Sequence, residues 1–143
     1  MSGVMDLDEI VRRFESLQKH EVARMGEFYT EDAFFKDPFN EVRGVARIEA
    51  IFLRMFDTLH EPRFRVVNRI VQGEQAMLEW DFTFRIPRWP PRRQWCIRGA
   101  SHLRFAPDGR IAYHRDFWDT GEELYAKLPV MGALVRWLRR RMG

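Results

Sequence analysis

The sequence predicts an α+β domain: a curved antiparallel sheet with N-terminal helices packed on one of its faces, plus a C-terminal helical extension. Segments with helical spacing of apolar residues occupy the first part of the chain, and long segments that alternate apolar and polar residues follow. This order favours helices that cover one side of a meandering sheet. The 143 residues, 45% of them hydrophobic, suit one domain with its own core.

Three helices are expected in the first part of the chain. Apolar side chains recur at helical spacing in residues 8–18, and a second short helix is expected at about 20–28. A third helix opens at Gly44 and carries an apolar stripe. Pro62 should stop it, because proline cannot continue a helix.

Five segments of the sequence are expected to form strands. "AFFKDP" predicts a short strand that ends near Asp37, because Pro38 cannot donate a ladder hydrogen bond. Long strand segments follow the helices, with turns around Gly73 and at "APDG", and they cover residues 63–73, 75–86, 94–105 and 110–118. The second of these alternates cleanly, so one of its faces should be buried. That face carries Leu78, Trp80, Phe82, Phe84 and Ile86.

The domain itself should span residues 8–120, after a flexible N-terminus at 1–7. In the extension, residues 121–143, apolar side chains recur at spacings of 4 and 3, which predicts an amphipathic helix. Such a helix packs on its own domain or covers a cavity mouth. The alternative is that its arginines bind an anionic membrane surface.

Composition excludes several classes of protein. Cys96 is the only cysteine, so no internal disulfide is possible, and no uncharged apolar run is long enough to span a membrane. The first residues lack the layout of a signal peptide, which predicts a cytoplasmic protein. No His, Cys and carboxylate cluster has zinc spacing, so we expect no metal and no cofactor.

The charge pattern gives one further alternative. The net charge is only +3, so no nucleic acid partner is expected. Residues 82–105 nevertheless interleave six arginines with aromatic residues and contain no acid. This segment is expected to form a hairpin loop with solvated charges. The alternative is a peripheral interaction protein that acts through this loop and the arginine-rich tail.

The segment "AYHRDFW" carries the residues best suited to chemistry. With a period of two, His114 and Asp116 share one face with Trp118, whereas Arg115 and Phe117 share the other. Each face places an aromatic ring beside a charge, so the alternation does not decide which face is buried. Residues two apart on a strand have Cα atoms about 7 Å apart, close enough to hydrogen-bond or to share one substrate.

The chain resembles the nuclear transport factor 2-like superfamily over roughly residues 8–120. The resemblance rests on the run Tyr-x-x-Asp-Ala-x-x-x-Asp-Pro-Phe from Tyr29 to Phe39, on the helix start at Gly44, and on "RFxxDGRI" followed by Phe117 and Trp118. The superfamily includes ketosteroid isomerases, SnoaL-type polyketide cyclases, limonene epoxide hydrolases and many proteins of unknown role. The resemblance implies the cone-shaped fold, and often a homodimer through the outer face of the sheet.

The resemblance also implies a pocket. The family's pocket-facing tryptophan aligns with Trp118, which would place His114 and Asp116 on the pocket face, and the general base of ketosteroid isomerases aligns with Asp37. Asp37, His114 and Asp116 are therefore the expected catalytic residues. The expected substrate-binding residues are Phe14, Phe52, Phe56, Trp80, Phe82, Phe84, Ser101 and Trp118.

Both oxyanion donors of ketosteroid isomerases are missing, because their positions fall on Phe14 and Ser101. The sequence is therefore not that of a typical ketosteroid isomerase. We expect a cofactor-independent acid–base enzyme of the isomerase, cyclase or hydratase type that acts on a small apolar ligand. A non-catalytic module that binds such a ligand is the alternative, and in that case Asp37 caps a turn and the His–Asp pair is a structural hydrogen bond.

Overall fold

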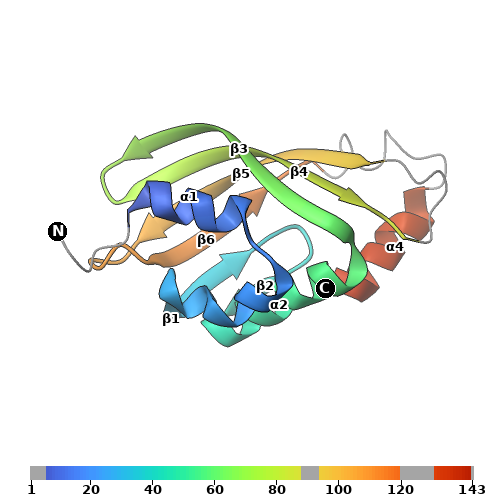
Figure 1. Ribbon diagram of the computed structural model, residues 1–143, viewed down its shortest axis with the longest axis horizontal. Coiled ribbons are helices and arrows are strands. Elements are labelled where there is room, and N and C mark those ends of the chain that lie inside the picture. Colours follow the sequence, from blue (N-terminus) through green and yellow to red (C-terminus); the bar gives the residue numbers. More distant parts are fainter. Residues whose placement is uncertain (1–5, 88–93, 120–130, 143) are drawn as a thin grey trace.

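A curved six-stranded sheet wraps over the helices in the computed structural model, which describes residues 6–87, 94–119 and 131–142 (Figure 1). The strands lie in the order β2-β1-β6-β5-β4-β3. Helix α1 spans Leu7–Glu15, η1 Lys19–Glu27, α2 Val45–Thr58 and α4 Met131–Met142. The strands are β1 Tyr29–Lys36, β2 Glu41–Arg43, β3 His60–Gln72, β4 Gln75–Arg85, β5 Trp95–Phe105 and β6 Ile111–Phe117. The predicted α+β class is confirmed.

One pair of strands departs from the antiparallel sheet that the sequence predicts. β1 and β6 run parallel, with Phe35 opposite His114, whereas the other neighbouring strands are antiparallel. A parallel pair needs a long connection, and α2 with β3, β4 and β5 provides it. Strand β1 begins at Tyr29 rather than at Ala33, and its register shifts between Tyr29 and Phe34. The short strand β2 was not predicted.

The second helix is a 3₁₀-helix rather than an α-helix. Its inward side chains are Val22 and Met25, and Phe28 follows directly after its end; all three are fully buried. A spacing of three places these side chains above one another in a 3₁₀-helix, whereas an α-helix would rotate them apart. The apolar pattern therefore fits the tighter helix, and the sequence alone did not distinguish the two.

Helix α2 begins where the sequence predicts. Gly44 is its N-cap residue with φ of 106°, a conformation that side chains disfavour, and its N–H donates to the Ala33 carbonyl at 2.8 Å. The helix ends at Thr58, before Pro62, which instead lies in the edge strand β3. An edge strand tolerates proline because its outward N–H groups need no partner strand.

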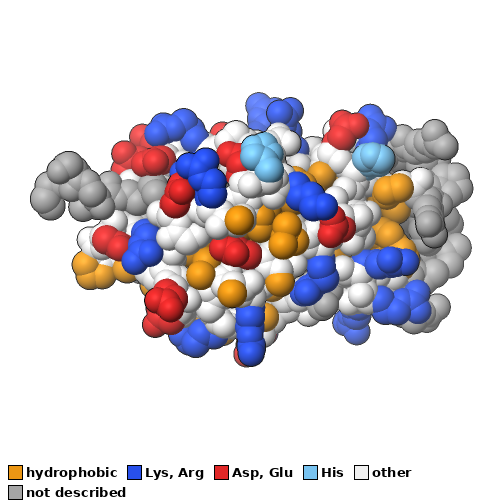
Figure 2. All heavy atoms as spheres, turned by 60° about the horizontal axis from the view of Figure 1, so that its bottom comes forward, with side chains coloured by type: hydrophobic (Ala, Val, Ile, Leu, Met, Phe, Trp, Pro, Cys, Tyr) orange, Lys and Arg blue, Asp and Glu red, His pale blue; other side chains and the backbone are white. Residues whose placement is uncertain are grey.

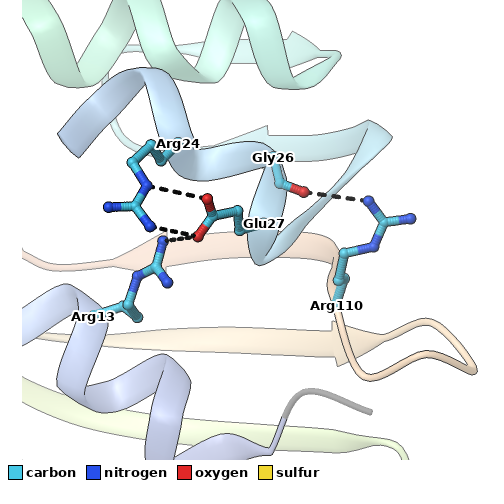
Figure 3. A network of polar contacts seen from close by, with 5 residues as sticks. All are labelled: Arg13, Arg24, Gly26, Glu27 and Arg110. Carbon is cyan, nitrogen blue, oxygen red and sulfur yellow. Dashed lines mark hydrogen bonds and ion pairs between the residues drawn. The ribbon is translucent and has the colours of Figure 1, made fainter. Parts of the chain in front are cut away.

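Polar contacts tie η1 to the elements on either side of it (Figure 3). The Glu27 carboxylate accepts hydrogen bonds from Arg13 of α1 at 2.8 Å and from Arg24 at 3.1 Å. Arg110, just before β6, donates to the Gly26 carbonyl at 3.2 Å. Exposed ion pairs contribute little to stability. The position of these ion pairs and of the Arg110 hydrogen bond matters more, because together they join α1, η1 and the residue before β6, and Arg110 also contacts the Tyr29 carbonyl at 3.5 Å.

Charged side chains of both signs are interspersed on the helix-covered face, with small apolar areas between them (Figure 2). Helix α4 packs against α2 and buries Leu138, while Arg139, Arg140 and Arg141 are exposed. Within the described ranges, no helix has the length and apolar character needed to cross a bilayer. The centre of the predicted arginine-rich loop, residues 88–93, and the first part of the extension, 120–130, lie outside the described residues.

The core lies between the concave face of the sheet and helices α1 and α2. Trp80 of β4 stands directly opposite Gly99 of β5, and both point inward. A Cβ atom at Gly99 would lie 2.5 Å from the Trp80 ring and 2.9 Å from the Phe117 carbonyl oxygen. The absent side chain therefore makes the space in which the indole ring lies across β5.

We predict that Gly99→Ala lowers the free energy of unfolding by about 1–3 kcal/mol, because the added methyl group overpacks this contact. Urea denaturation followed by tryptophan fluorescence measures the change. Gly26→Ala is the matched control, since no atom lies within 4 Å of a Cβ at that position. Equal effects of the two substitutions would show that Trp80 does not rest on Gly99.

Candidate functional site

Two hollows meet at Asp116. An inner cavity of about 20 Å³ lies between α1 and the concave face of the sheet, with room for about one water molecule. An outer cleft of about 450 Å³ lies at the ends of β1 and β6, and Asp37, Asp116 and Trp118 line it. Asp116 lines both hollows, so this carboxylate borders the cleft on one side and the polar groups of the core on the other.

Two hydrogen bonds converge on one oxygen of Asp116. Its Oδ1 accepts from the Ser101 hydroxyl at 2.5 Å and lies 2.6 Å from Nε2 of His114. Each of these groups is held by one further residue. The Trp80 indole N–H donates to Ser101 Oγ at 2.8 Å, and the Tyr29 hydroxyl lies 2.5 Å from Nδ1 of His114. Asp116 is thus the meeting point of two arms, one through Ser101 and one through His114.

The His114 arm is buried among aromatic rings. His114 is 4% exposed, and the plane of its ring lies parallel to that of Tyr29 at a centroid distance of 5.9 Å. Phe14 and Phe35 contact its other sides edge-on, at 5.8 and 4.8 Å. The face of β6 that carries His114 and Asp116 is therefore the inner one, which the alternation of the sequence left undecided.

Asp37 ends β1 and closes the turn to β2. Its Oδ1 accepts from the backbone N–H groups of Phe39 at 2.8 Å and Asn40 at 2.6 Å, and from the Asn40 side chain at 3.1 Å. Burial raises the pKa of Asp37 above its usual value; the Phe39 N–H opposes this rise, and the negative charge of Asp116 adds to it. Asp37 thus caps a turn and is also a poorly solvated carboxylate in the cleft.

In each of the two carboxylates, Oδ1 accepts most of the hydrogen bonds. Oδ2 of Asp116 accepts no hydrogen bond from any residue within the described ranges, and Oδ2 of Asp37 has only a 3.3 Å contact with the Asn40 side chain. The bound oxygens fix both groups in place. Two carboxylates in one cleft, in different surroundings, can divide the tasks of acid and base between them.

Ser101, His114 and Asp116 do not form a nucleophilic triad. Such a triad needs the serine hydroxyl bonded to the histidine, which removes its proton. Here Ser101 donates to Asp116, and His114 contacts the same carboxylate oxygen. Over the described part of the chain, no group of His, Cys, Asp and Glu side chains is arranged to hold a metal ion.

The other predicted site residues fall into three places. Those that line the inner cavity are Phe14, Phe52, Trp80 and Ser101. Trp118 lines the outer cleft and contacts the Phe39 ring at 5.5 Å. Phe56 lies at a separate surface hollow, and Phe82 and Phe84 pack in the core against each other. Aromatic rings that were expected to wall a pocket thus largely fill it, which is why the inner cavity is small.

Tyr29 and Gly99 take part in the site although sequence reasoning did not single them out. Tyr29 begins the run on which the family resemblance rests, but the register that pairs Phe35 with His114 would place it opposite Asp108. The register shift between Tyr29 and Phe34 brings it opposite Ile111 instead, closer to His114. Gly99 acts through the space that it leaves for Trp80. Its position opposite Trp80 follows only from strand pairing.

Solved structures share this architecture. A protein of ketosteroid isomerase-like fold from Catenulispora acidiphila, in complex with trimethylamine, is 15% identical with a TM-score of 0.70, over 83% of this chain and 89% of that chain. A putative SnoaL-like polyketide cyclase from Jannaschia sp. is 17% identical with a TM-score of 0.70, over 89% and 91%. An epoxide hydrolase-like protein from M. tuberculosis is 19% identical with a TM-score of 0.67, over 90% and 96%. At these identities the likeness shows the fold alone.

The sequence itself matches one family. The model of the SnoaL-like domain matches residues 10–114, which is most of the chain, whereas no curated protein sequence matches it. The matched residues include the α1 to β6 region that carries Tyr29, Asp37 and His114. The chain therefore belongs to the SnoaL-like domain family and has the nuclear transport factor 2-like fold that its sequence predicts.

Proposed function

We propose that this protein is a small-molecule enzyme that uses Asp37 and Asp116 as a cofactor-independent acid–base pair. One observation carries the proposal: both carboxylates line the same cleft, and in each of them Oδ1 accepts most of the hydrogen bonds that the fold provides. The raised pKa of Asp37 brings its proton exchange closer to neutral pH, where a general acid or base is most effective.

The proposed reaction moves a proton at a carbon atom of the ligand. One carboxylate removes a proton from carbon beside an electron-withdrawing group, and the other delivers a proton elsewhere on the same molecule. Isomerisation and ring closure follow this scheme; in an addition of water the base takes the proton from the water molecule, and the acid delivers a proton to carbon. The enzyme begins with one carboxyl protonated and one ionised, and its total number of protons is unchanged because one group gains the proton that the other loses. The two donors on Oδ1 of Asp116 hold its second oxygen in position for such a transfer.

The outer cleft supports an apolar ligand of modest size. Its volume of about 450 Å³ lies within the range of about 300–1,000 Å³ that is typical of small-molecule sites. Phe117 and Trp118 offer apolar contacts there, while the inner cavity has room only for water or a small substituent. Two of the similar structures support a small ligand. The Catenulispora acidiphila protein was solved in complex with trimethylamine, and the Jannaschia protein is described as a putative polyketide cyclase.

We further propose a homodimer formed through the outer face of the sheet. Three large apolar side chains are exposed there: Ile70 at 65%, Met77 at 38% and Phe117 at 43%. Ile70 and Met77 are cross-strand partners, so they form one continuous apolar area. Exposed apolar area of this kind is typical of an interface.

The acid–base pair can be tested with 5-nitrobenzisoxazole, whose ring opens to a coloured phenolate when a base removes its carbon-bound proton. We expect Asp37→Asn and Asp116→Asn each to lower kcat/KM by about 10²–10⁴-fold, the usual contribution of a positioned base or acid. Asp32→Asn is the control, because Asp32 is an exposed carboxylate of the same strand as the Asp37 turn. Full activity in both site variants would show that neither carboxylate is the acid or the base, whereas a wild type without activity above the buffer rate would leave ligand binding without catalysis as the function.

The ionised form of Asp37 should also lower the free energy of unfolding at neutral pH. A carboxyl group whose pKa is raised by folding stabilises the fold below its unfolded pKa of about 3.9, and this contribution is lost as the pH rises through the folded pKa. Asp37→Asn cannot ionise, so we expect it to be more stable than the wild type at pH 7 and to lose that advantage near pH 3.5. Urea denaturation at several pH values checks this; an Asp37→Asn variant that is less stable at pH 7 would contradict it.

Sedimentation velocity at micromolar concentration should show a dimer. Met77→Glu places a charge in the proposed interface and should shift the protein towards the monomer without unfolding it, since Met77 is outside the core. Thr30→Glu, a partly exposed position on β1, is a control for the added charge. A wild-type protein that sediments only as a monomer would refute this interface.

A further inference from the structure

We infer that Tyr29 is a positioning residue that holds His114 in the one tautomer with its proton on Nε2, so that His114 acts on Asp116 and not on the ligand. The tautomer follows from the hydrogen bonds of His114 and from the burial of Tyr29. Its consequence for catalysis rests on the proposed function of Asp116.

The Tyr29 hydroxyl keeps its proton. Its side chain is 0% exposed and sits among the rings of Phe14, Phe28 and His114. Burial, and after it the negative charge of Asp116, raises the pKa of Tyr29 well above its usual value. The hydroxyl is therefore a donor, and Nδ1 of His114 at 2.5 Å is its hydrogen-bond partner in the described part of the chain.

The hydrogen bond donated by Tyr29 determines which ring nitrogen of His114 carries the proton. A hydroxyl that donates to Nδ1 needs a lone pair there, so the ring proton must be on Nε2. Nε2 then donates to Oδ1 of Asp116 at 2.6 Å, which a carboxylate oxygen can only accept. The opposite tautomer would place the Nε2 lone pair against this oxygen and leave the buried Tyr29 proton without an acceptor among the described residues, which is unfavourable.

Both ring nitrogens of His114 are consequently engaged inside the fold. Neither is available to a molecule in the outer cleft, and His114 is not among the residues that line that cleft. A proton relay from Tyr29 through the imidazole to Asp116 would leave a buried tyrosinate, which the raised pKa of Tyr29 opposes. The arm therefore orients Asp116 and transfers no proton to it.

Nitrogen NMR of the ¹⁵N-labelled wild-type protein tests the inference directly. Long-range correlations between ring protons and nitrogens distinguish a protonated ring nitrogen from one with a lone pair, and the signals of His114 are identified by their loss in His114→Gln. We expect Nε2 of His114 to be protonated and Nδ1 to carry the lone pair. A wild-type spectrum with the proton on Nδ1, or on both nitrogens at pH 7.5, would overturn the inference whatever the variants do.

Tyr29→Phe removes only the hydroxyl. We expect the Nδ1 shift of His114 to move away from its hydrogen-bonded value, and kcat for 5-nitrobenzisoxazole to fall about tenfold with little change in KM. Tyr113→Phe is the matched control, since Tyr113 stacks on Phe34 at 5.4 Å across the same β1–β6 pair but outside the His114 arm. An unchanged His114 spectrum in Tyr29→Phe would also overturn the inference. If the spectra agree and the wild type does not turn over the probe, the proposed function fails while the tautomer assignment stands.

Discussion

Two hydrogen bonds donated to one carboxylate oxygen organise the concave side of this protein. Oδ1 of Asp116 receives the Ser101 hydroxyl and the His114 ring, and each of these is held from behind by a large aromatic side chain. The arms come from four elements, β1, β4, β5 and β6, so the position of Asp116 depends on the pairing of all of them. The other oxygen of this carboxylate accepts no hydrogen bond from the described residues, and Asp116 also lines the cleft.

The polar arms lie in an otherwise aromatic core, where an unpaired polar group is costly and a satisfied network is rigid. Each hydrogen bond in the two arms is donated toward Asp116, so all the protons of the network have a single arrangement. The Trp80 indole reaches Ser101 because Gly99 leaves room for it. Packing and hydrogen bonding are coupled here: a methyl group at Gly99 would disturb the aromatic layer and the carboxylate together.

The periodicity of the sequence was sufficient for most of the fold. It predicted α1, the Gly44 start of α2 and the buried face of β4, because each follows from local spacing or from a single backbone requirement. It did not predict the parallel pairing of β1 with β6, which depends on distant residues. Within the site, Asp37, His114 and Asp116 were expected from their residue types and from the family resemblance. The role of Tyr29 and the small volume of the inner cavity were not, because a register shift and the mutual packing of rings leave no mark in a sequence pattern.

The parallel pairing of β1 with β6 also governs when the site can exist. Tyr29 and His114 are 85 positions apart, and closing so long a segment of chain carries an entropic cost that later contacts must repay. During synthesis on a ribosome, β1 is made early, but it cannot pair with β6 until nearly the whole domain has been synthesised. Until then the Tyr29 hydroxyl lacks its partner His114, and β1 has only β2 beside it. The residues that complete the site are therefore among the last to meet during folding, and a chain that stops short of β6 would lack the site altogether.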